Sequence, residues 1–355
     1  MSGVSIKFGL TASYPGADYG GYVQFVKEAE NMGFDSVWFP DHLVFVSQGR
    51  EALDAWTLIT SASKETNKIQ LGAVGDPHRI HPAVLAHRLA TVDQLNNHRT
   101  NICLGVGEAM NLDPFGIQWD NPLDRLSESM DVMRMLWSND HTNPVNFNGE
   151  YFKLKDAFIQ IKLPNQSKSI PMHIATTTKQ GLRLTGEKAD GWIPIDLTPD
   201  LYSHYYSQIQ SSADSVNRSL DDFDPCLWVF TSLGKNEDEA YKTLEPWRYV
   251  CIMQNQLEHA GYSIDIPEEY KGLNYFNVLP TDEERRNKLR ELGSFFPREA
   301  VIDFTITGSK NDCIKKIEKF IDKGVRHFIF FHYFSPDFKE AQKIYSEEII
   351  PYFRS

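Results

Sequence analysis

Short apolar runs rich in β-branched and aromatic residues alternate with segments of helical spacing along almost the whole chain of 355 residues. The first unit has a predicted strand over Ile6–Ala12 and a predicted helix over Tyr22–Met32, which Gly33 ends. Further strands are predicted over Ser36–His42, Ile69–Val74, Asn101–Gly107, Pro171–Ala175, Gly191–Ile195, Asp224–Ser232 and His327–Phe331. Eight strand–helix units in order predict an α/β fold of the (β/α)8 or TIM barrel type rather than an open sheet.

End signals mark several of the expected helices. Pro82 opens a helix that runs toward Leu95, and Ser309 caps a helix that runs to Ile321 and ends at Gly324. The remaining helices are expected over Ala52–Lys64, Leu123–Leu136, Leu182–Gly186, Leu201–Ser215 and Glu340–Ile350.

Two stretches interrupt the alternation. Between positions 143 and 163, an Asn148-Gly149 turn lies between β-prone residues and predicts an inserted hairpin. The region from 236 to 298 is helical, charged and longer than a standard connection, so we expect an excursion over the barrel mouth. We therefore expect residues 1–355 to form a single barrel domain with these two insertions.

Charge and cysteine content limit the class of protein. A net charge of −12 argues against a nucleic-acid interface, which needs a basic face. No uninterrupted apolar run approaches about 18 residues, and the N-terminus lacks the apolar region of a signal peptide. Four cysteines lie far apart in the sequence, which is typical of reduced intracellular thiols. The expectation is a cytoplasmic protein that binds neither nucleic acid nor membrane.

The residues that follow the predicted strands are the first candidates for a site, because barrel enzymes act at the carboxyl ends of their strands. They are Asp41, His42, Val74, Gly75, Glu108, Thr176, Thr177 and Asp196. A histidine and a carboxylate from alternate strands can form a proton-transfer pair, which makes His42 and Glu108 the catalytic candidates. A hydrogen-bonded structural role is the alternative for His42. The Gly105-Val106-Gly107 run lacks the third glycine of a dinucleotide fingerprint.

The segment Ala175-Thr176-Thr177-Thr178-Lys179 leads from a strand into a helix N-terminus. Free backbone N–H groups, hydroxyls and an ammonium group there can hold a phosphate. A plain Thr178 N-cap with a solvated lysine is the alternative.

Metal binding is not expected. His78, His81 and His87 crowd one loop and helix, but no carboxylate or cysteine lies at ligand spacing from them.

Several motifs resemble the bacterial-luciferase-like superfamily, and within it the branch that uses the deazaflavin coenzyme F420. They are Asp41-His42, Gly107-Glu108-Ala109-Met110-Asn111, Val132-Met133-Arg134-Met135-Leu136-Trp137, Phe147-Asn148-Gly149-Glu150-Tyr151-Phe152 and Ala189-Asp190-Gly191. Each is a weak signal, but their order is specific. They are most similar to F420-dependent secondary alcohol and glucose-6-phosphate dehydrogenases, and more distantly to methylenetetrahydromethanopterin reductase.

The resemblance implies roles for individual residues. Asp41 and His42 would lie beside the deazaflavin ring, Glu108 would donate or accept the proton, and Asn111 would help to hold the cofactor. The Val74–Gly75 bond matches the place where the family has a non-prolyl cis peptide behind the ring. The cofactor's phosphate would bind at a segment that is usually small and glycine-rich in the family, here Ala175, Thr176, Thr177 and Thr178.

Three departures from the family pattern concern the substrate. The tryptophan that lies four residues beyond the histidine in the dehydrogenases is replaced by Val46, with Phe45 as the nearest aromatic residue, so Phe45 and Val46 are expected in the substrate pocket. The basic residues that hold a sugar phosphate are absent around Asp196, Leu257 and Phe304, so glucose 6-phosphate is not expected as the substrate. The reductase's first-strand glutamate is also missing.

The resemblance therefore implies an oxidoreductase that transfers a hydride between F420 and a small alcohol, carbonyl compound or similar substrate. An FMN-dependent monooxygenase, a methylenetetrahydromethanopterin reductase-like enzyme and a flavin-binding protein without turnover are the alternatives. Because Trp247, Tyr249, Met253 and Phe295 lie in the excursion, they could line an apolar substrate pocket, and packing onto the barrel is their alternative role.

The resemblance also suggests a homodimer through early barrel helices. The predicted helix that begins at Pro82 is compatible with this assembly, because Val84, Leu85 and Leu89 are expected on its exposed face.

Overall fold

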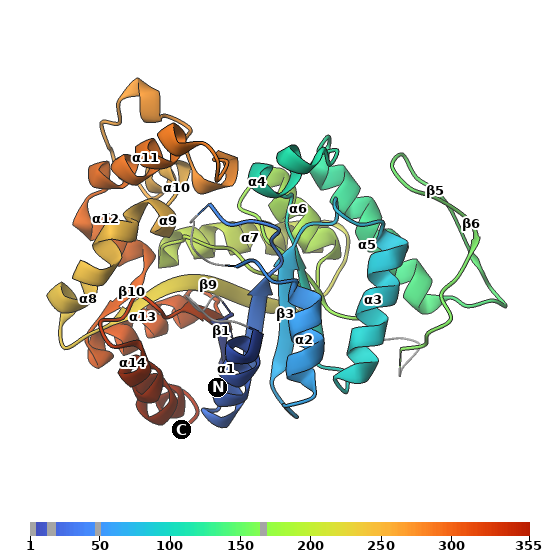
Figure 1. Ribbon diagram of the computed structural model, residues 1–355, viewed down its shortest axis with the longest axis horizontal. Helices are drawn as coiled ribbons and strands as arrows, with labels where there is room; N and C mark the ends of the chain where they lie inside the picture. Colours follow the sequence, from blue (N-terminus) through green and yellow to red (C-terminus); the bar gives the residue numbers. More distant parts are fainter. Residues whose placement is uncertain (1–4, 13–18, 47–50, 164–168) are drawn as a thin grey trace.

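The computed structural model describes residues 5–12, 19–46, 51–163 and 169–355. Within these residues, eight parallel strands close into a barrel (Figure 1). In barrel order the strands are β1 (Lys7–Thr11), β2 (Ser36–Pro40), β3 (Gln70–Gly75), β4 (Thr100–Leu104), β7 (Met172–Ile174), β8 (Gly191–Trp192), β9 (Asp224–Leu233) and β11 (His327–Phe331). Because β8 pairs with β9 and β11 pairs with β1, the ring of strands is complete. The predicted (β/α)8 barrel is confirmed.

Side chains along each strand alternate between the barrel interior and the layer beneath the helices. Trp38 points inward from β2 and forms a small buried cluster with Trp228 and Ile329. Its neighbour Phe39 belongs to the large core between strands and helices. Gly72 on the adjacent strand β3 makes room for the indole, since a Cβ atom there would lie 2.5 Å from Trp38 Cε3. The barrel interior is therefore packed with side chains.

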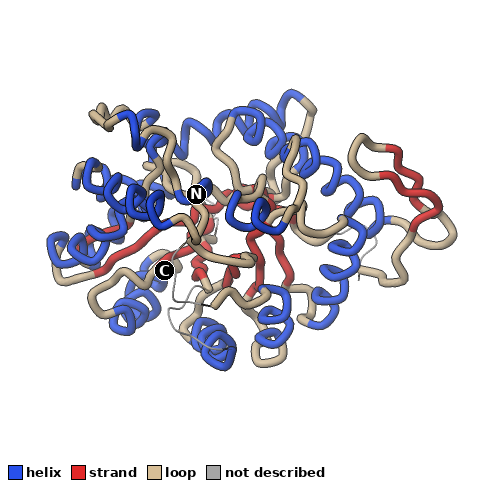
Figure 2. The backbone as a smooth tube through the Cα atoms, turned by 45° about the horizontal axis from the view of Figure 1, so that its top comes forward, coloured by secondary structure: helices blue, strands red, loops and turns tan. Residues whose placement is uncertain are grey.

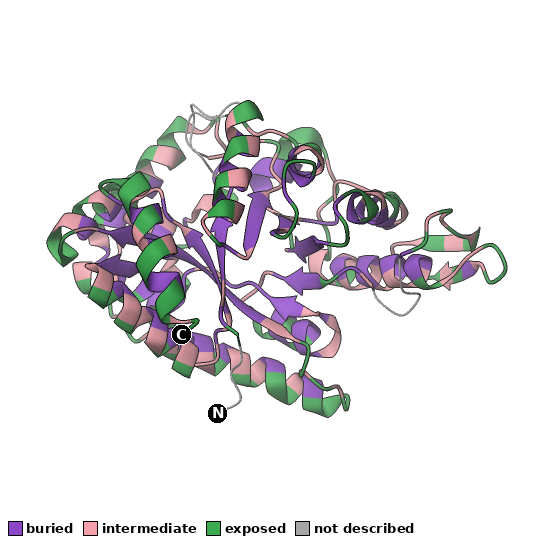
Figure 3. Cartoon of the chain, turned by 90° about the horizontal axis from the view of Figure 1, so that it is seen from below, coloured by how far each residue is buried: buried purple, intermediate pink, exposed green. Residues whose placement is uncertain are grey.

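The helices surround the strands, with their buried faces toward the sheet (Figures 2 and 3). The helices of the barrel layer are α1 (Tyr19–Asn31), α2 (Ala55–Ser63), α3 (Pro82–Leu95), α5 (Pro122–Ser138), α6 (Lys179–Lys188), α7 (Pro199–Ser215), α13 (Lys310–Asp322) and α14 (Phe338–Ile344). The expected end signals operate as predicted. Thr178 caps α6 by accepting from the Gly181 N–H, and Ser309 and Asp312 form a capping box at α13. None of the helices in the described part of the chain is both long enough and apolar enough to cross a bilayer.

The predicted hairpin is present as β5 (Val145–Asn148) and β6 (Lys153–Ala157), which pair antiparallel and project from the barrel beside α5 (Figure 1). Its turn is anchored to α5 by Glu128, whose carboxylate accepts hydrogen bonds from the N–H groups of residues 150–152 at 2.7 to 3.1 Å.

The excursion is helical, as predicted, and lies on the α4 side of the barrel (Figure 1). It contains α8 (Glu237–Leu244), η2 (Glu245–Trp247), α9 (Arg248–Cys251), α10 (Gln254–His259), η3 (Glu268–Tyr270), η4 (Tyr275–Asn277), α11 (Glu283–Leu292), η5 (Gly293–Phe295) and α12 (Arg298–Phe304). Its apolar residues Leu257, Leu273 and Leu289 join the main core. The strand β10 (Ile306–Gly308) was not predicted; it pairs with Thr231–Leu233, where β9 extends beyond the barrel.

Two expectations about the barrel elements are corrected. The predicted strand over Gly191–Ile195 is regular only to Trp192, because Pro194 has no N–H to donate to a neighbouring strand. Of the apolar residues expected on the exposed face of α3, only Val84 is exposed, at 53%. Leu85 and Leu89 are buried because α3 packs against α5, whose Trp137 indole N–H donates to the Ala86 carbonyl at 3.0 Å.

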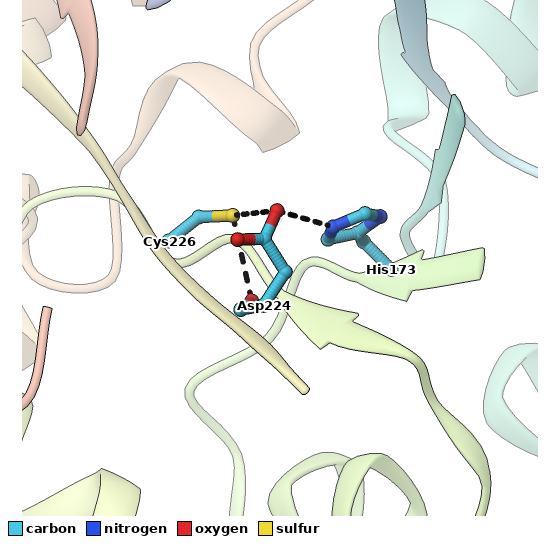
Figure 4. A group of neighbouring side chains, drawn as sticks. All are labelled: His173, Asp224 and Cys226. Carbon is cyan, nitrogen blue, oxygen red and sulfur yellow. Dashed lines mark hydrogen bonds and ion pairs between the residues drawn. The ribbon is translucent and has the colours of Figure 1, made fainter. Parts of the chain in front are cut away.

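A polar cluster lies inside the barrel near the amino ends of the strands (Figure 4). Asp224 Oδ2 lies 3.2 Å from His173 Nε2, 2.9 Å from His327 Nδ1 and 3.4 Å from Cys226 Sγ. Burial acts to raise the pKa of the Asp224 carboxyl, but His327 and His173 outweigh burial and hold this pKa well below its usual range. The cluster is a hydrogen-bond network centred on Asp224, in which His173 Nδ1 has no partner among the described residues, and it lies at the end of the barrel opposite to the strand ends that carry the site candidates.

Candidate active site

The predicted proton-transfer pair comes together at the carboxyl ends of β2 and β4. His42 Nε2 lies 3.4 Å from Glu108 Oε2, and the two side chains are 20% and 15% exposed. Glu108 follows Gly107, whose φ of 91° belongs to the region that favours glycine. A Cβ atom at Gly107 would also lie 2.5 Å from Leu112 Cδ1, so both this φ and the close contact favour glycine in the turn that aims Glu108 at His42.

Asn111 fixes the position of Glu108. It lies in the short helix α4 (Ala109–Leu112), and its Nδ2 donates to Glu108 Oε2 at 2.9 Å. Its Oδ1 accepts from the backbone N–H groups of Leu43 and Val44 at 2.7 and 3.1 Å. Asn111, predicted as a cofactor contact, therefore ties the loop after β2 to the loop after β4.

Asp41 belongs to an ion-pair chain that the sequence did not reveal. Arg79 Nη2 lies 3.0 Å from Asp41 Oδ2, and Arg79 Nε donates to Asp76 Oδ2 at 2.8 Å. Burial raises the pKa of the Asp41 carboxyl, although Arg79 opposes this shift. The partners of Asp41 were missed because a charged residue 38 positions away gives no local signal.

The expectation of a cis peptide bond between Val74 and Gly75 is wrong, because this bond is trans. β3 remains regular to its last residue, with Gly75 in register with Leu104. The Asp41 N–H donates to the Val74 carbonyl at 2.8 Å, and the Gly105 N–H donates to the Gly75 carbonyl at 2.8 Å. These bonds continue the parallel pairing on both sides of the strand end.

The threonine segment after β7 serves as a helix cap, and its hydroxyls have partners. Thr176 Oγ1 accepts from the Thr178 N–H at 3.2 Å, and Thr177 Oγ1 accepts from Gln256 Nε2 at 2.9 Å. Gln256 lies on α10 and is fully buried, so the excursion is fastened to this segment. Ala175 lies beside the segment, and an anion site over Ala175, Thr176, Thr177 and Thr178 stays a prediction.

The residues predicted for the substrate pocket are spread over two regions. The Phe45 ring lies 4.9 Å from the His42 ring, and Val46 packs against the main core. Trp247 is 39% exposed and packs on Phe334, with 5.8 Å between ring centroids. Met253 is half-buried at the N-terminus of α10. Phe45 therefore adjoins the His42–Glu108 pair, whereas the contacts of Trp247 are those of packing.

His78 and His81 have different partners, and His87 is exposed on α3. His78 Nε2 contacts the Val106 carbonyl at 3.1 Å, and His81 caps α3 by accepting from the Ala83 N–H. In the part of the chain that the structure describes, ligand atoms close enough for one metal ion occur at His173, Asp224 and Cys226, within 4.8 Å of one another. Asp224 already bonds to both His173 and Cys226 (Figure 4), and the absence of a metal stays a prediction.

Comparisons with known proteins agree with this architecture. An F420-dependent glucose-6-phosphate dehydrogenase from Microbacterium testaceum is 26% identical over 359 residues, covering 99% of this chain and 98% of the relative. A 5,10-methylenetetrahydromethanopterin reductase from Archaeoglobus fulgidus is 26% identical over 352 residues, covering 98% and 99%.

A solved structure of an F420-dependent secondary alcohol dehydrogenase in complex with an F420-acetone adduct has a TM-score of 0.81. Its sequence identity is 23%, with 99% of this chain and 100% of that chain covered, so this likeness shows the fold. The sequence model of a family described as luciferase-like monooxygenase matches residues 1–327, and the chain belongs to that family.

Proposed function

We propose that this protein is an oxidoreductase that transfers a hydride between coenzyme F420 and a small uncharged alcohol or carbonyl compound. The observation that carries the proposal is the His42–Glu108 pair, 3.4 Å apart and held by Asn111 at the barrel mouth. Two relatives match nearly the whole chain. One is an F420-dependent glucose-6-phosphate dehydrogenase and the other a 5,10-methylenetetrahydromethanopterin reductase, and both support the choice of cofactor.

The residues around this pair fit a planar cofactor. His42 Nδ1 is buried and has no hydrogen-bond partner among the described residues, so a polar atom of a bound ring can complete it. Asp41, which precedes His42, donates its N–H to the Val74 carbonyl at the end of β3. The α6 N-terminus with Thr176 and Thr178 would hold a phosphate. When bound, F420 supplies the ring carbon that exchanges hydride with the substrate.

The chain's own side chains handle the proton. Oxidation of an alcohol to a carbonyl compound removes a hydride and a proton, so a base must take the hydroxyl proton. His42 Nε2 and Glu108 Oε2 are close enough to pass that proton between them, and reduction of a carbonyl compound uses the reverse transfer. The Asn111 amide donates to Glu108 Oε2 and thereby favours one orientation of the carboxylate.

A fluorescence titration tests the cofactor. The purified protein should change the fluorescence of F420 in a saturable way, and F420 reduction should follow addition of 2-propanol. FMN serves as the matched probe. Tight binding of FMN without binding of F420 would overturn the proposal and favour a flavin monooxygenase, in line with the family description.

Assembly and location are part of the same proposal. Exposed Val84 on α3 is compatible with a homodimer through the early helices. Light scattering that shows only monomer at micromolar concentration would reject the dimer. The four cysteines are free and buried, which suits the reducing cytoplasm.

A further inference from the structure

Arg79, in the loop after β3, holds the residue that precedes His42. Its Nη2 donates to the backbone carbonyl oxygen of Asp41 at 2.6 Å and lies 3.0 Å from Asp41 Oδ2. Its Nε donates to Asp76 Oδ2 at 2.8 Å. Because a guanidinium group is a rigid planar fork, these bonds set the place of the Asp41 carbonyl as well as that of its carboxylate.

The Asp41 carbonyl belongs to the peptide group that joins Asp41 to His42. This group is planar, so a bond to its oxygen fixes the direction in which the chain enters His42. The N–H of Asp41 is fixed as well, because it donates to the Val74 carbonyl at 2.8 Å. The backbone that leads into the histidine is therefore bonded at both its donor and its acceptor.

Asn111 holds the chain on the other side of His42. Its Oδ1 accepts from the N–H groups of residues 43 and 44 at 2.7 and 3.1 Å, and its Nδ2 donates to Glu108 Oε2 at 2.9 Å. Arg79 is the counterpart of Asn111 on the β3 side. Together the two side chains fix the backbone before and after the histidine whose Nε2 lies 3.4 Å from Glu108 Oε2.

The Arg79 side chain has little room to move. It is 13% exposed, and its partner Asp76 is 5% exposed. Asp76 Oδ1 accepts from the N–H groups of His78 and Arg79 at 2.9 and 3.3 Å, so this carboxylate is itself held in place. A Cβ atom at Gly75 would lie 3.1 Å from Arg79 Nη2, and glycine there leaves room for the guanidinium group. The bonds to Asp41 therefore come from a buried and oriented group.

We propose that Arg79 is a positioning residue that fixes His42 opposite Glu108 through the backbone of Asp41. This inference rests on the proposed function, in which His42 and Glu108 move the proton, and adds a residue outside the pair. Proton transfer needs a donor and an acceptor within hydrogen-bond reach of each other. A displacement of about 1 Å at the reacting groups can lower a rate by about 10²-fold. An ion pair that only stabilised the fold would leave the kcat of the folded enzyme unchanged.

The kinetic test compares Arg79→Ala with Arg79→Lys, using F420 and 2-propanol as the probes. Without the guanidinium group, kcat should fall by roughly 10- to 100-fold, while KM for 2-propanol should change by less than about twofold. Lysine keeps the charge but not the fork, so Arg79→Lys should recover part of the loss. Arg134→Ala is the matched control, because Arg134 forms a 2.9 Å ion pair with Asp190 at the amino end of β8, and its kcat should equal that of the wild type.

Chemical rescue separates positioning from damage to the fold. A cavity of about 150 Å³ is lined by Arg79, Asp41 and Asp76, among other residues. Loss of the Arg79 side chain would enlarge this cavity, so an added guanidinium ion can take the place of the missing group. Millimolar guanidinium should raise the kcat of Arg79→Ala and leave that of Arg134→Ala unchanged. A folded Arg79→Ala that gains no activity from guanidinium would count against the proposal.

Hydrogen exchange of the protein without cofactor provides a readout that is independent of turnover. The amides of residues 41–44 should exchange at least about 10-fold faster in Arg79→Ala, whereas Arg134→Ala should leave them unchanged. Arg79→Lys carries the same comparison if Arg79→Ala does not fold. Unchanged exchange at these amides, or a wild-type kcat in Arg79→Ala, would overturn the proposal. Faster exchange in Arg79→Ala, together with no F420-dependent turnover by the wild type, would instead count against the proposed function alone.

Discussion

The proposed proton-transfer role of Glu108 can be tested by substituting this one residue. Glu108→Gln keeps the shape and the hydrogen bond from Asn111 but cannot take up or release a proton near neutral pH. We expect kcat to fall by about 10² to 10⁴-fold, the usual contribution of an acid–base group. F420 affinity and melting temperature should change little.

Steady-state kinetics, fluorescence titration and thermal melting measure these three quantities. His42→Gln in parallel identifies the more important partner. Near-normal rates in both variants would reject the pair, and lost stability with full activity would make Glu108 structural.

Substitution of Asn111, which bonds to Glu108, should change the pH dependence of the rate. Asn111→Asp places a second carboxylate 2.9 Å from Glu108, where the two negative charges disfavour the ionised form of both. The acidic limb of the pH–rate profile should move to higher pH.

Asn111→Ala is the control for the lost hydrogen bonds. It leaves the Leu43 and Val44 N–H groups without their acceptor and should cost about 1 to 3 kcal/mol of unfolding free energy. Because it adds no charge, an equal displacement of the pH profile in both variants would contradict the electrostatic argument.

The turn between β4 and α4 positions Glu108 through Gly107, and Gly116 follows shortly after α4. Gly107 and Gly116 both have positive φ, at 91° and 65°. A Cβ atom at Gly107 would lie 2.5 Å from Leu112 Cδ1, whereas nothing lies within 4 Å of one at Gly116.

Gly116→Ala should therefore cost only backbone strain, about 1 kcal/mol, while Gly107→Ala should cost about 1 to 3 kcal/mol and also lower kcat by displacing Glu108. Urea denaturation and initial rates measure the two effects. Equal losses of activity in the two variants would show that the turn does not position Glu108.

The pH dependence of stability is a property of the whole molecule, and His332 makes an identifiable contribution to it. The side chain is fully buried after β11, where Gln342 lies 2.8 Å from its Nε2. Burial lowers the pKa of His332 to about 3. In the unfolded chain the pKa of histidine is about 6.5.

Because the folded-state pKa is the lower one, the unfolded state binds a proton first as the pH falls. The contribution of His332 is fully present above about pH 6.5 and declines toward about pH 3, by up to 1.4 kcal/mol per pH unit. His332→Gln should therefore show a flatter loss of stability over this window. Denaturant titrations at several pH values measure it, and parallel profiles for the two proteins would contradict the assignment.

Much of the fold follows from local patterns. The helix from Pro82 to Leu95 has the predicted bounds, because a proline at the first turn and the apolar periodicity act within a few residues. Thr178 and Ser309 cap their helices for the same reason. The pairing of His42 with Glu108 was also predictable, because a barrel brings all its strand ends to one rim.

Only the tertiary structure decided the contacts between residues that are far apart in the sequence. Asn111 meets the Leu43 N–H 68 positions away, and Gln256 meets Thr177 79 positions away. The exposed face of α3 was misjudged because periodicity gives the width of an apolar stripe but not which neighbour covers it. Local sequence therefore determined the strands, the helices and which polar residues follow each strand. Closure of the barrel determined which of these side chains find hydrogen-bond partners, and it left Asp196 without one among the described residues.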